Sequence, residues 1–471
     1  MISDTICAPA TAAGGAIAII RVSGQDCFRA LDSVVSFRRG DASSAQGFTI
    51  KFGVIQDLDE VLVSVFRAPH SYTGEDMAEI SCHASPFIVS GILDRLCAAG
   101  CRLALAGEFT QRAFVAGKMD LSQAEAVADL IASDSAASHK LAFSQLRGAY
   151  SQKLSDLRAQ IVELSALLEL ELDFSEEELE FAERGKLRAL ALETLEETRR
   201  LADSFRLGNA FKKGIPVAIV GAVNSGKSTL LNALLGDDRA IVSDIPGTTR
   251  DTVEELLTIG GVKYRFIDTA GIRETEETVE RMGIERSFAQ MEQASVVIVM
   301  LDGTAQLQQL QEVVSAVKAR LRPEARVIWV RSKADLLPGT KRGHIVPKIQ
   351  ENVSFGNNRE GFCSRLGIPE TIELSALTGQ GLDALREAIS TPDSDALASD
   401  SVLVTNQRHY EALRRASEDL QRVLDGLGSG LPNDLIAEDL RSGASALGEI
   451  VGEILPDDIL GTVFSRFCIG K

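Results

Sequence analysis

Apolar positions follow two different periods along this chain, and the change of period divides it into regions. Short apolar runs over residues 16–22 and 61–66 predict strands, and residues 86–99 have the spacing of an amphipathic helix. Residues 1–118 are therefore predicted to form an α+β domain.

Residues 119–212 and 381–471 are predicted to be helical. Each region has a stripe of apolar residues spaced by three, four or seven, which predicts one buried face on a long helix. The stripes consist of Leu154, Leu157, Ile161, Leu164 and Leu168, and of Ile436, Leu440, Leu447, Val451 and Ile454. Because these regions flank residues 213–380, we expect a helical domain with another domain inserted into it.

The inserted region, residues 213–380, has the pattern of an α/β domain. Apolar runs over residues 215–220, 296–301 and 327–330 predict buried strands, and residues 252–267 predict a hairpin that turns at Gly260-Gly261. The chain as a whole is thus predicted to be a multidomain α/β protein.

Residues 221–228, GAVNSGKS, fit the phosphate-loop pattern of Gly, four residues and Gly-Lys-Ser/Thr. They follow a predicted strand and precede a predicted helix, where backbone N–H groups can surround phosphate oxygens. Lys227 is expected to reach the terminal phosphates and to act in catalysis, and the Ser228 hydroxyl is expected to bind Mg²⁺. The predicted loop contacts are Asn224, Ser225, Gly226, Lys227, Ser228 and Thr229.

Two segments after the loop fit the rest of a nucleoside triphosphate site. Thr249 is a candidate second hydroxyl ligand of Mg²⁺. Asp268 ends a predicted strand and Gly271 follows it, which suits a metal-side carboxylate and a backbone that contacts the γ-phosphate.

The base is predicted to be guanine. Residues 332–335, SKAD, resemble the Asn-Lys-x-Asp motif of GTPases, so Ser332, Lys333 and Asp335 are candidate base contacts. The Asp335 carboxylate can accept hydrogen bonds from the N1–H and the exocyclic amine of guanine. Adenine has no such donor pair, which disfavours an ATPase. Ser375 and Ala376 fit the last base-contact motif.

Two positions depart from common GTPases. Ser332 stands where Asn is usual, so one contact to the base is expected to be shorter or lost. Ile272 stands where Ras-like enzymes have a water-orienting Gln, and an apolar side chain cannot orient water. Another carboxylate, amide or cation must then assist hydrolysis, and residues 273–281 are the nearest source of carboxylates.

Composition narrows the classes further. A chain of 471 residues exceeds one ordinary core, and a net charge of −18 weighs against a broad basic surface for nucleic acid. The seven cysteines are scattered, and Cys97 and Cys101 have no second pair that would complete a zinc site. Without a signal peptide or an apolar run of 18 residues, we expect a cytoplasmic protein and no membrane partner.

Several further segments are typical of one family. They are residues 4–6, 19–24, 71–76, 107–114, 117–126 and 467–471. On these segments the chain resembles the MnmE (TrmE) family of bacterial tRNA modification GTPases, in the TrmE-Era-Septin-like superfamily, over nearly its whole length.

The resemblance implies an N-terminal domain, residues 1–118, that binds folate and forms a homodimer. The implied contacts to 5-formyltetrahydrofolate or a related tetrahydrofolate are Arg21, Glu79, Lys118 and Lys471. It also implies that the protein acts with the flavoprotein MnmG to add a carboxymethylaminomethyl or aminomethyl group at carbon 5 of the wobble uridine of certain tRNAs.

For the nucleotide domain, the resemblance implies dimerisation across the nucleotide faces and a bound K⁺ ion. The matching K⁺ ligands are the Asn224 side chain, the carbonyls of Ser243 and Ile245, and the region of Thr248. The residue that matches the family's water-orienting acid is Glu280.

Two questions stay open at this point. The GTPase motifs alone fit equally well a regulatory switch that recruits partners without modifying tRNA, although the N-terminal and C-terminal segments favour modification. The Cys468 thiol fits either a nucleophile activated by nearby cations or a buried structural thiol.

Overall fold

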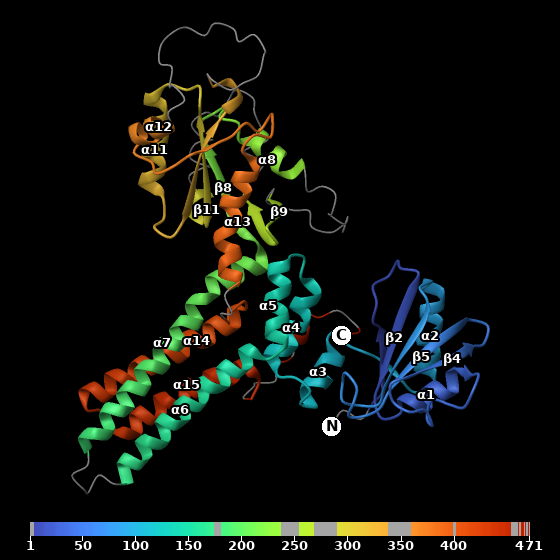
Figure 1. Ribbon diagram of the computed structural model, residues 1–471. Coiled ribbons are helices and arrows are strands. Elements are labelled where there is room, and N and C mark those ends of the chain that lie inside the picture. The colour runs from blue at the N-terminus through green and yellow to red at the C-terminus, as the bar shows by residue number, and fades with distance from the viewer. Residues whose placement is uncertain are drawn as a thin grey trace. The chain divides into compact units, whose positions relative to one another are not determined.

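The computed structural model describes residues 4–173, 180–236, 254–267, 290–337, 359–398, 402–453, 460, 463–465, 467 and 470. The chain divides into two compact units (Figure 1). The first contains Met1–Ala132, Ala142–Ala202 and Gln407–Lys471, and the second contains Ser133–Leu141 and Asp203–Asn406. The first unit is therefore discontinuous in sequence, as expected for a helical domain with an insertion.

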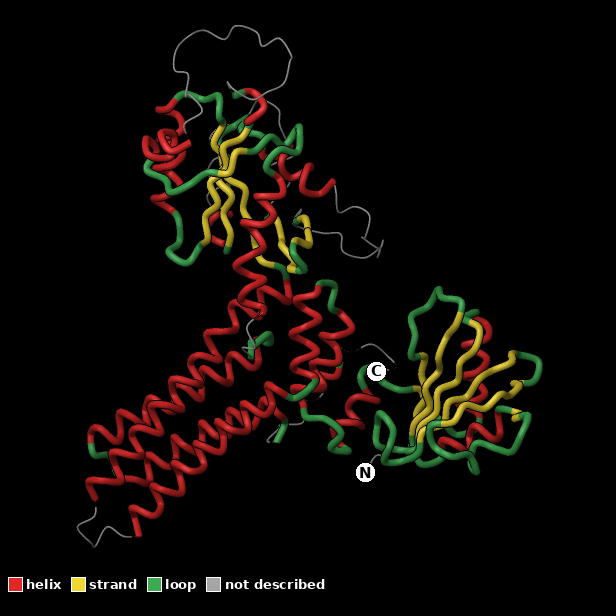
Figure 2. The backbone as a smooth tube through the Cα atoms, viewed as in Figure 1, coloured by secondary structure: helices red, strands yellow, loops and turns green. Residues whose placement is uncertain are grey.

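A seven-stranded sheet forms the N-terminal part of the first unit (Figure 2). Its order is β3-β4-β5-β6-β2-β1-β7, and all neighbours are antiparallel except β1 and β7. The strands are β1 (Ile6–Pro9), β2 (Ile17–Ser23), β3 (Ser36–Phe37), β4 (Thr49–Ile55), β5 (Asp59–Phe66), β6 (Met77–His83) and β7 (Arg102–Leu103).

The two faces of this sheet differ. Helices α1 (Cys27–Val34) and α2 (Pro86–Ala98) cover one face, where alternate strand residues such as Ile20, Val63 and Ile80 are fully buried. On the other face, helix α3 (Glu108–Val115) packs on β1 through Phe109. Because side chains alternate along a strand, the residues between the buried ones point to this second face.

The helical part of the first unit has two long buried stripes. Leu154, Leu157, Ile161, Leu164 and Leu168 are all at most 1% exposed, which confirms the predicted stripe. Ile436, Leu440 and Leu447 of the second predicted stripe are also buried. Val451, predicted to be buried, is only half-buried, and its neighbour Ile450 is buried instead. The helix ends at Val451, before the left-handed Gly452, and Ile454 lies outside the described residues.

The bounds of these helices are α4 (Leu121–Ala132), α5 (Ala136–Leu146), α6 (Ala149–Asp173), α7 (Glu180–Lys213), α14 (Gln407–Ser429) and α15 (Asn433–Val451). By the division above, the first residues of α5 and the last residues of α7 belong to the second unit.

The second unit contains a six-stranded sheet of order β13-β12-β11-β8-β10-β9. Only β9 runs antiparallel to its neighbour. The strands are β8 (Ile215–Gly221), β9 (Glu255–Ile259), β10 (Val262–Phe266), β11 (Val296–Asp302), β12 (Arg326–Ser332) and β13 (Ile372–Glu373). Parallel strands place their carboxyl ends at one edge, where ligands of such sheets bind.

Helices cover both faces of this sheet, which is why the central strands β8 and β11 are apolar up to their carboxyl ends. Helices α8 (Lys227–Gly236) and α13 (Leu382–Ala398) pack on one face, and α11 (Leu307–Arg320) and α12 (Arg359–Leu366) pack on the other. The predicted strands and the hairpin turn at Gly260-Gly261 are confirmed.

Candidate nucleotide and folate sites

The phosphate loop connects β8, which ends at Gly221, to α8, which begins at Lys227. Asn224 and Gly226 have φ of 61° and 95°, so both adopt the left-handed conformation that turns successive N–H groups toward one concavity. A Cβ atom at Gly221 would lie 2.6 Å from the Met300 carbonyl oxygen, so only glycine fits there. The loop therefore has the backbone geometry of an anion site at a helix N-terminus.

Two side chains of the loop lack an ordinary structural role. The Lys227 ammonium donates to the carbonyl oxygens of Gly221 (3.0 Å) and Ala222 (2.8 Å), and burial lowers its pKa. The fully buried Ser225 hydroxyl has no hydrogen-bond partner within the described part of the chain. A half-buried ammonium with no carboxylate partner among the described residues, and an unsatisfied buried hydroxyl next to it, fit an anionic ligand.

The predicted base-binding residues lie at the same sheet edge. Ser332 is the last residue of β12, and Asp335 lies in the short 3-10 helix Ala334–Leu336. The Ala334 N–H donates to the Leu374 carbonyl at 3.0 Å, which brings the Ser375 segment beside this loop. The fold thus brings together two segments that the sequence predicted for the base.

Ser332 contacts the phosphate loop. Its buried hydroxyl donates to the Ser225 carbonyl oxygen at 2.8 Å, and the Leu301 carbonyl oxygen lies at 3.3 Å. Serine at this position thus connects the base-binding loop to the phosphate loop through a hydrogen bond. The sequence did not reveal this role.

Ser332→Ala is therefore expected to weaken GTP binding by about 1 kcal/mol, roughly fivefold, because the Ser225 carbonyl loses its donor and the two loops lose their tie. Isothermal titration calorimetry measures the effect, and Ser315→Ala on the exposed face of α11 is the matched control. Equal affinities of the two variants would show that the tie does not contribute to binding.

Arg21 and Glu79 form an ion pair on the second face of the N-terminal sheet. They are directly opposite each other on β2 and β6, and the Arg21 guanidinium donates to Glu79 Oε1 at 2.8 and 3.1 Å. The Tyr72 and Phe109 rings lie 5.1 and 5.5 Å from the guanidinium carbon. Sequence reasoning missed both rings, although each lies in a segment typical of the family.

The end of the chain reaches this pair. Arg21 donates to the Gly470 carbonyl oxygen at 3.3 Å, across 449 positions of sequence. Gly470 has φ of 96°, and a Cβ atom there would lie 1.9 Å from the Pro9 carbonyl oxygen. Phe464 and Phe467 pack beside Leu121 and Ala124 of α4 and fix the preceding tail.

Of the other residues predicted for the folate site, the structure describes Lys118. Lys118 donates to the Pro69 carbonyl oxygen at 2.9 Å and lies beside Gly74, in the loop that also carries Tyr72. Several predicted positions lie outside the described residues. They are Ser243, Ile245, Thr248, Thr249, Asp268, Gly271, Ile272, Glu280, Cys468 and Lys471.

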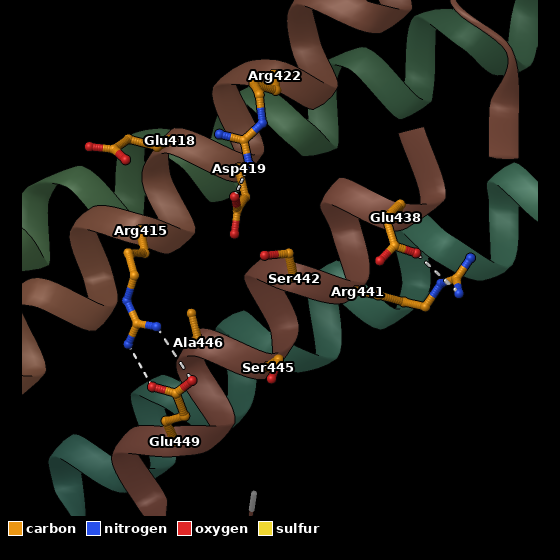
Figure 3. Close-up of a pocket in the computed structure, with 10 residues that line it drawn as sticks. All are labelled: Arg415, Glu418, Asp419, Arg422, Glu438, Arg441, Ser442, Ser445, Ala446 and Glu449. Carbon is orange, nitrogen blue, oxygen red and sulfur yellow. Dashed lines mark hydrogen bonds and ion pairs between the residues drawn. The ribbon is translucent and has the colours of Figure 1, made fainter. Parts of the chain in front are cut away.

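A pocket of about 520 Å³ between α14 and α15 is a third candidate (Figure 3). Six of its charged side chains are paired with one another: Arg415 with Glu449, Arg441 with Glu438, and Arg422 with Asp419. Glu418 pairs with Arg414, which lies outside the pocket lining. Arg422 also bridges to Asp439 of α15 at 2.7 Å. The Arg415–Glu449 and Arg422–Asp439 pairs connect the two helices, and each charged side chain of the lining has an ion-pair partner, so we assign the pocket a structural role.

A phosphate loop joined to a loop with Asp335 at the carboxyl edge of a parallel sheet defines a P-loop GTPase. Family profiles support this class and narrow it. The profile "MnmE helical domain" matches residues 121–468, and "GTP-binding protein TrmE N-terminus" matches residues 5–118. The chain belongs to the MnmE family of tRNA modification GTPases.

Curated relatives match over the whole chain. The tRNA modification GTPase MnmE of Bacteroides fragilis is 46% identical over 478 residues, covering 100% of both chains. The proteins of the same name from Bacteroides thetaiotaomicron and Parabacteroides distasonis are 46% and 47% identical, and cover 100% and 99% of this chain and 100% of their own. In the described part of the chain, no helix is both long and apolar enough to span a membrane.

Proposed function

We propose that this protein is a potassium-stimulated GTPase that acts with a flavoprotein partner, MnmG, in modifying tRNA. The product is a carboxymethylaminomethyl or aminomethyl group at carbon 5 of the wobble uridine. One observation carries the proposal. The chain that holds the phosphate loop also joins Arg21, Glu79 and the Gly470 backbone in a second polar site.

The nucleotide site fits GTP with Mg²⁺. Lys227 neutralises charge on the terminal phosphates, Ser228 and Thr249 supply hydroxyl ligands to Mg²⁺, and Asp335 reads guanine. Asp268 and Gly271 complete the metal side and the γ-phosphate side, and Glu280 orients the attacking water in place of the missing Gln. These roles rest on the family motifs and on the loop geometry described above.

Asn224 is the proposed side-chain ligand of K⁺, together with the carbonyls of Ser243 and Ile245 and the region of Thr248. It is exposed at the loop, and its side chain makes no hydrogen bond with the described residues. An amide oxygen at this point can hold a monovalent cation next to the transferring phosphate, where the charge stabilises the transition state.

Hydrolysis is accordingly expected to be about 10- to 100-fold slower in Na⁺ than in K⁺. Asn224→Gly should abolish this difference, since glycine keeps the left-handed backbone and removes only the amide. Single-turnover hydrolysis in matched salts measures it, with the exposed Val223→Ala as control. Equal rates of the unmodified protein in the two salts would rule out the K⁺ role.

The N-terminal site fits a reduced folate. The Arg21 guanidinium suits the carbonyl or carboxylate groups of the ligand, and the partly exposed Glu79 can accept hydrogen bonds from its amino-substituted ring. Tyr72 beside Arg21 offers a ring face. Lys118 and Lys471 would supply further cations for 5-formyltetrahydrofolate or a related tetrahydrofolate.

We also propose that the protein is a homodimer that assembles through the second face of the N-terminal sheet. Ile50, Phe52 and Val54 on β4 are 69%, 39% and 38% exposed, and Leu62 on β5, directly opposite Phe52, is 49% exposed. A contiguous exposed apolar surface of this kind is typical of an association site, and a second copy offers the same surface.

Phe52→Asp combined with Leu62→Asp is expected to convert the dimer to a monomer, because each copy would bury two carboxylates without partners. Sedimentation velocity measures the change. Val115→Asp, at a residue of α3 that is 68% exposed, is the control. A double variant that stays dimeric at low concentration would place the interface elsewhere.

The test of the function as a whole is mass spectrometry of tRNA nucleosides from a strain that lacks this chain. We expect wobble uridines without the modification, restored by the intact gene and not by a gene with Lys227→Ala. Unchanged nucleosides in the deletion strain would contradict the proposal and favour a regulatory switch that takes no part in modification.

A further inference from the structure

Asp302 lies beside the base-binding loop but belongs to none of the motifs above. It is the last residue of β11 and stands opposite Ser332 in the parallel register of β11 and β12. The Lys333 ammonium donates to Asp302 Oδ2 at 2.7 Å. The Asp302 side chain is 16% exposed and the Lys333 side chain 33%, so the pair is partly shielded from water.

The Asp302 carboxylate is itself held in place. Its Oδ1 atom accepts hydrogen bonds from the Thr304 N–H at 2.9 Å and from the Thr304 hydroxyl at 2.7 Å. Burial raises the pKa of Asp302, but the bonds from Lys333 and Thr304 outweigh it and keep the pKa below its usual value. The Asp302 carboxylate that accepts the hydrogen bond from Lys333 is therefore both fixed and charged.

The backbone between these residues is closely packed. The Gly303 N–H donates to the Ser332 carbonyl oxygen at 3.0 Å, and a Cβ atom at Gly303 would lie 2.8 Å from that oxygen. Lys333 has φ of 58°, a left-handed conformation that costs energy for a residue with a side chain. A strained conformation of this kind persists only where its surroundings hold it, and Asp302 is one of the groups that do so.

We propose that Asp302 is a positioning residue of the guanine site, acting through Lys333; this rests on the base site proposed above. Lys333 lies between Ser332, which is tied to the phosphate loop, and Asp335, which reads the base. With its ammonium fixed by Asp302, the apolar stem of Lys333 forms a wall against which the flat base packs. Fixing the stem before binding reduces the entropy lost when the nucleotide binds.

Asp302→Asn is expected to weaken both GTP and GDP about three- to tenfold, because the two nucleotides share the base. The rate of hydrolysis at saturating GTP should stay the same, since Asp302 contacts no phosphate-binding residue among those described. In the background of Lys333→Ala, the same substitution should have no further effect on affinity.

Asp393→Asn is the matched control. Asp393 pairs with Arg326 at 2.7 Å, is 15% exposed, and lies at the opposite end of β12 from Lys333. It should leave both affinities unchanged. Full affinity in Asp302→Asn, or a fall in the saturated rate with affinity unchanged, would overturn the positioning role. Asp335→Asn provides the separate test of the base site: if it also bound GTP normally, the guanine site itself would be wrong.

Discussion

Replacing Lys227 by alanine is expected to slow GTP hydrolysis by about 100- to 1000-fold. The Lys227 ammonium is held over the phosphate loop by two carbonyl oxygens, and the described residues offer it no carboxylate. The phosphate oxygens of a bound triphosphate would accept hydrogen bonds from this ammonium in place of the two carbonyl oxygens. Its removal takes away the one cation of the loop at the point where negative charge grows during phosphate transfer.

Single-turnover hydrolysis at saturating GTP measures this loss. Lys318→Ala is the matched control, because the exposed Lys318 of α11 also donates to a backbone carbonyl, that of Gly367, away from the phosphate loop. The control should hydrolyse GTP normally. A Lys227→Ala enzyme that also kept its rate would show that the loop does not bind the triphosphate as proposed.

Replacing Arg21 by alanine is expected to abolish tRNA modification and to weaken 5-formyltetrahydrofolate binding at least about tenfold. The guanidinium contacts Glu79, two aromatic rings and the Gly470 carbonyl, so one substitution removes the proposed folate contact and also the hydrogen bond to Gly470. It should leave GTP hydrolysis unchanged, because Arg21 belongs to the first compact unit and the phosphate loop belongs to the second.

Folate titration and nucleoside mass spectrometry measure the two effects on the same preparation. Arg29→Ala is the control, since Arg29 lies in the same domain on α1 and its side chain is 79% exposed. Normal folate affinity in Arg21→Ala would move the folate site elsewhere. Normal folate affinity together with lost tRNA modification would show that Arg21 acts only through its hydrogen bond to Gly470 and does not contact the folate.

Local sequence patterns were enough to predict the buried helix faces, the phosphate loop and the family of this protein. The apolar periods predicted the buried faces of α6 and α15, apart from one position near the end of α15 where Ile450 replaces Val451. The phosphate loop was recognisable because its residues are consecutive and its strand and helix flank it directly. The comparisons confirm the predicted family and the GTPase class, since both rest on contiguous motifs.

Only the tertiary structure decided which distant residues meet. The register of β2 and β6 places Arg21 opposite Glu79, and packing of Phe464 and Phe467 on α4 brings Gly470 to that pair. Likewise, parallel pairing of β11 and β12 puts Asp302 next to Lys333 and lets Ser332 reach the phosphate loop. A local pattern cannot specify such pairs, because strand register and tail packing depend on the whole core and not on neighbouring residues.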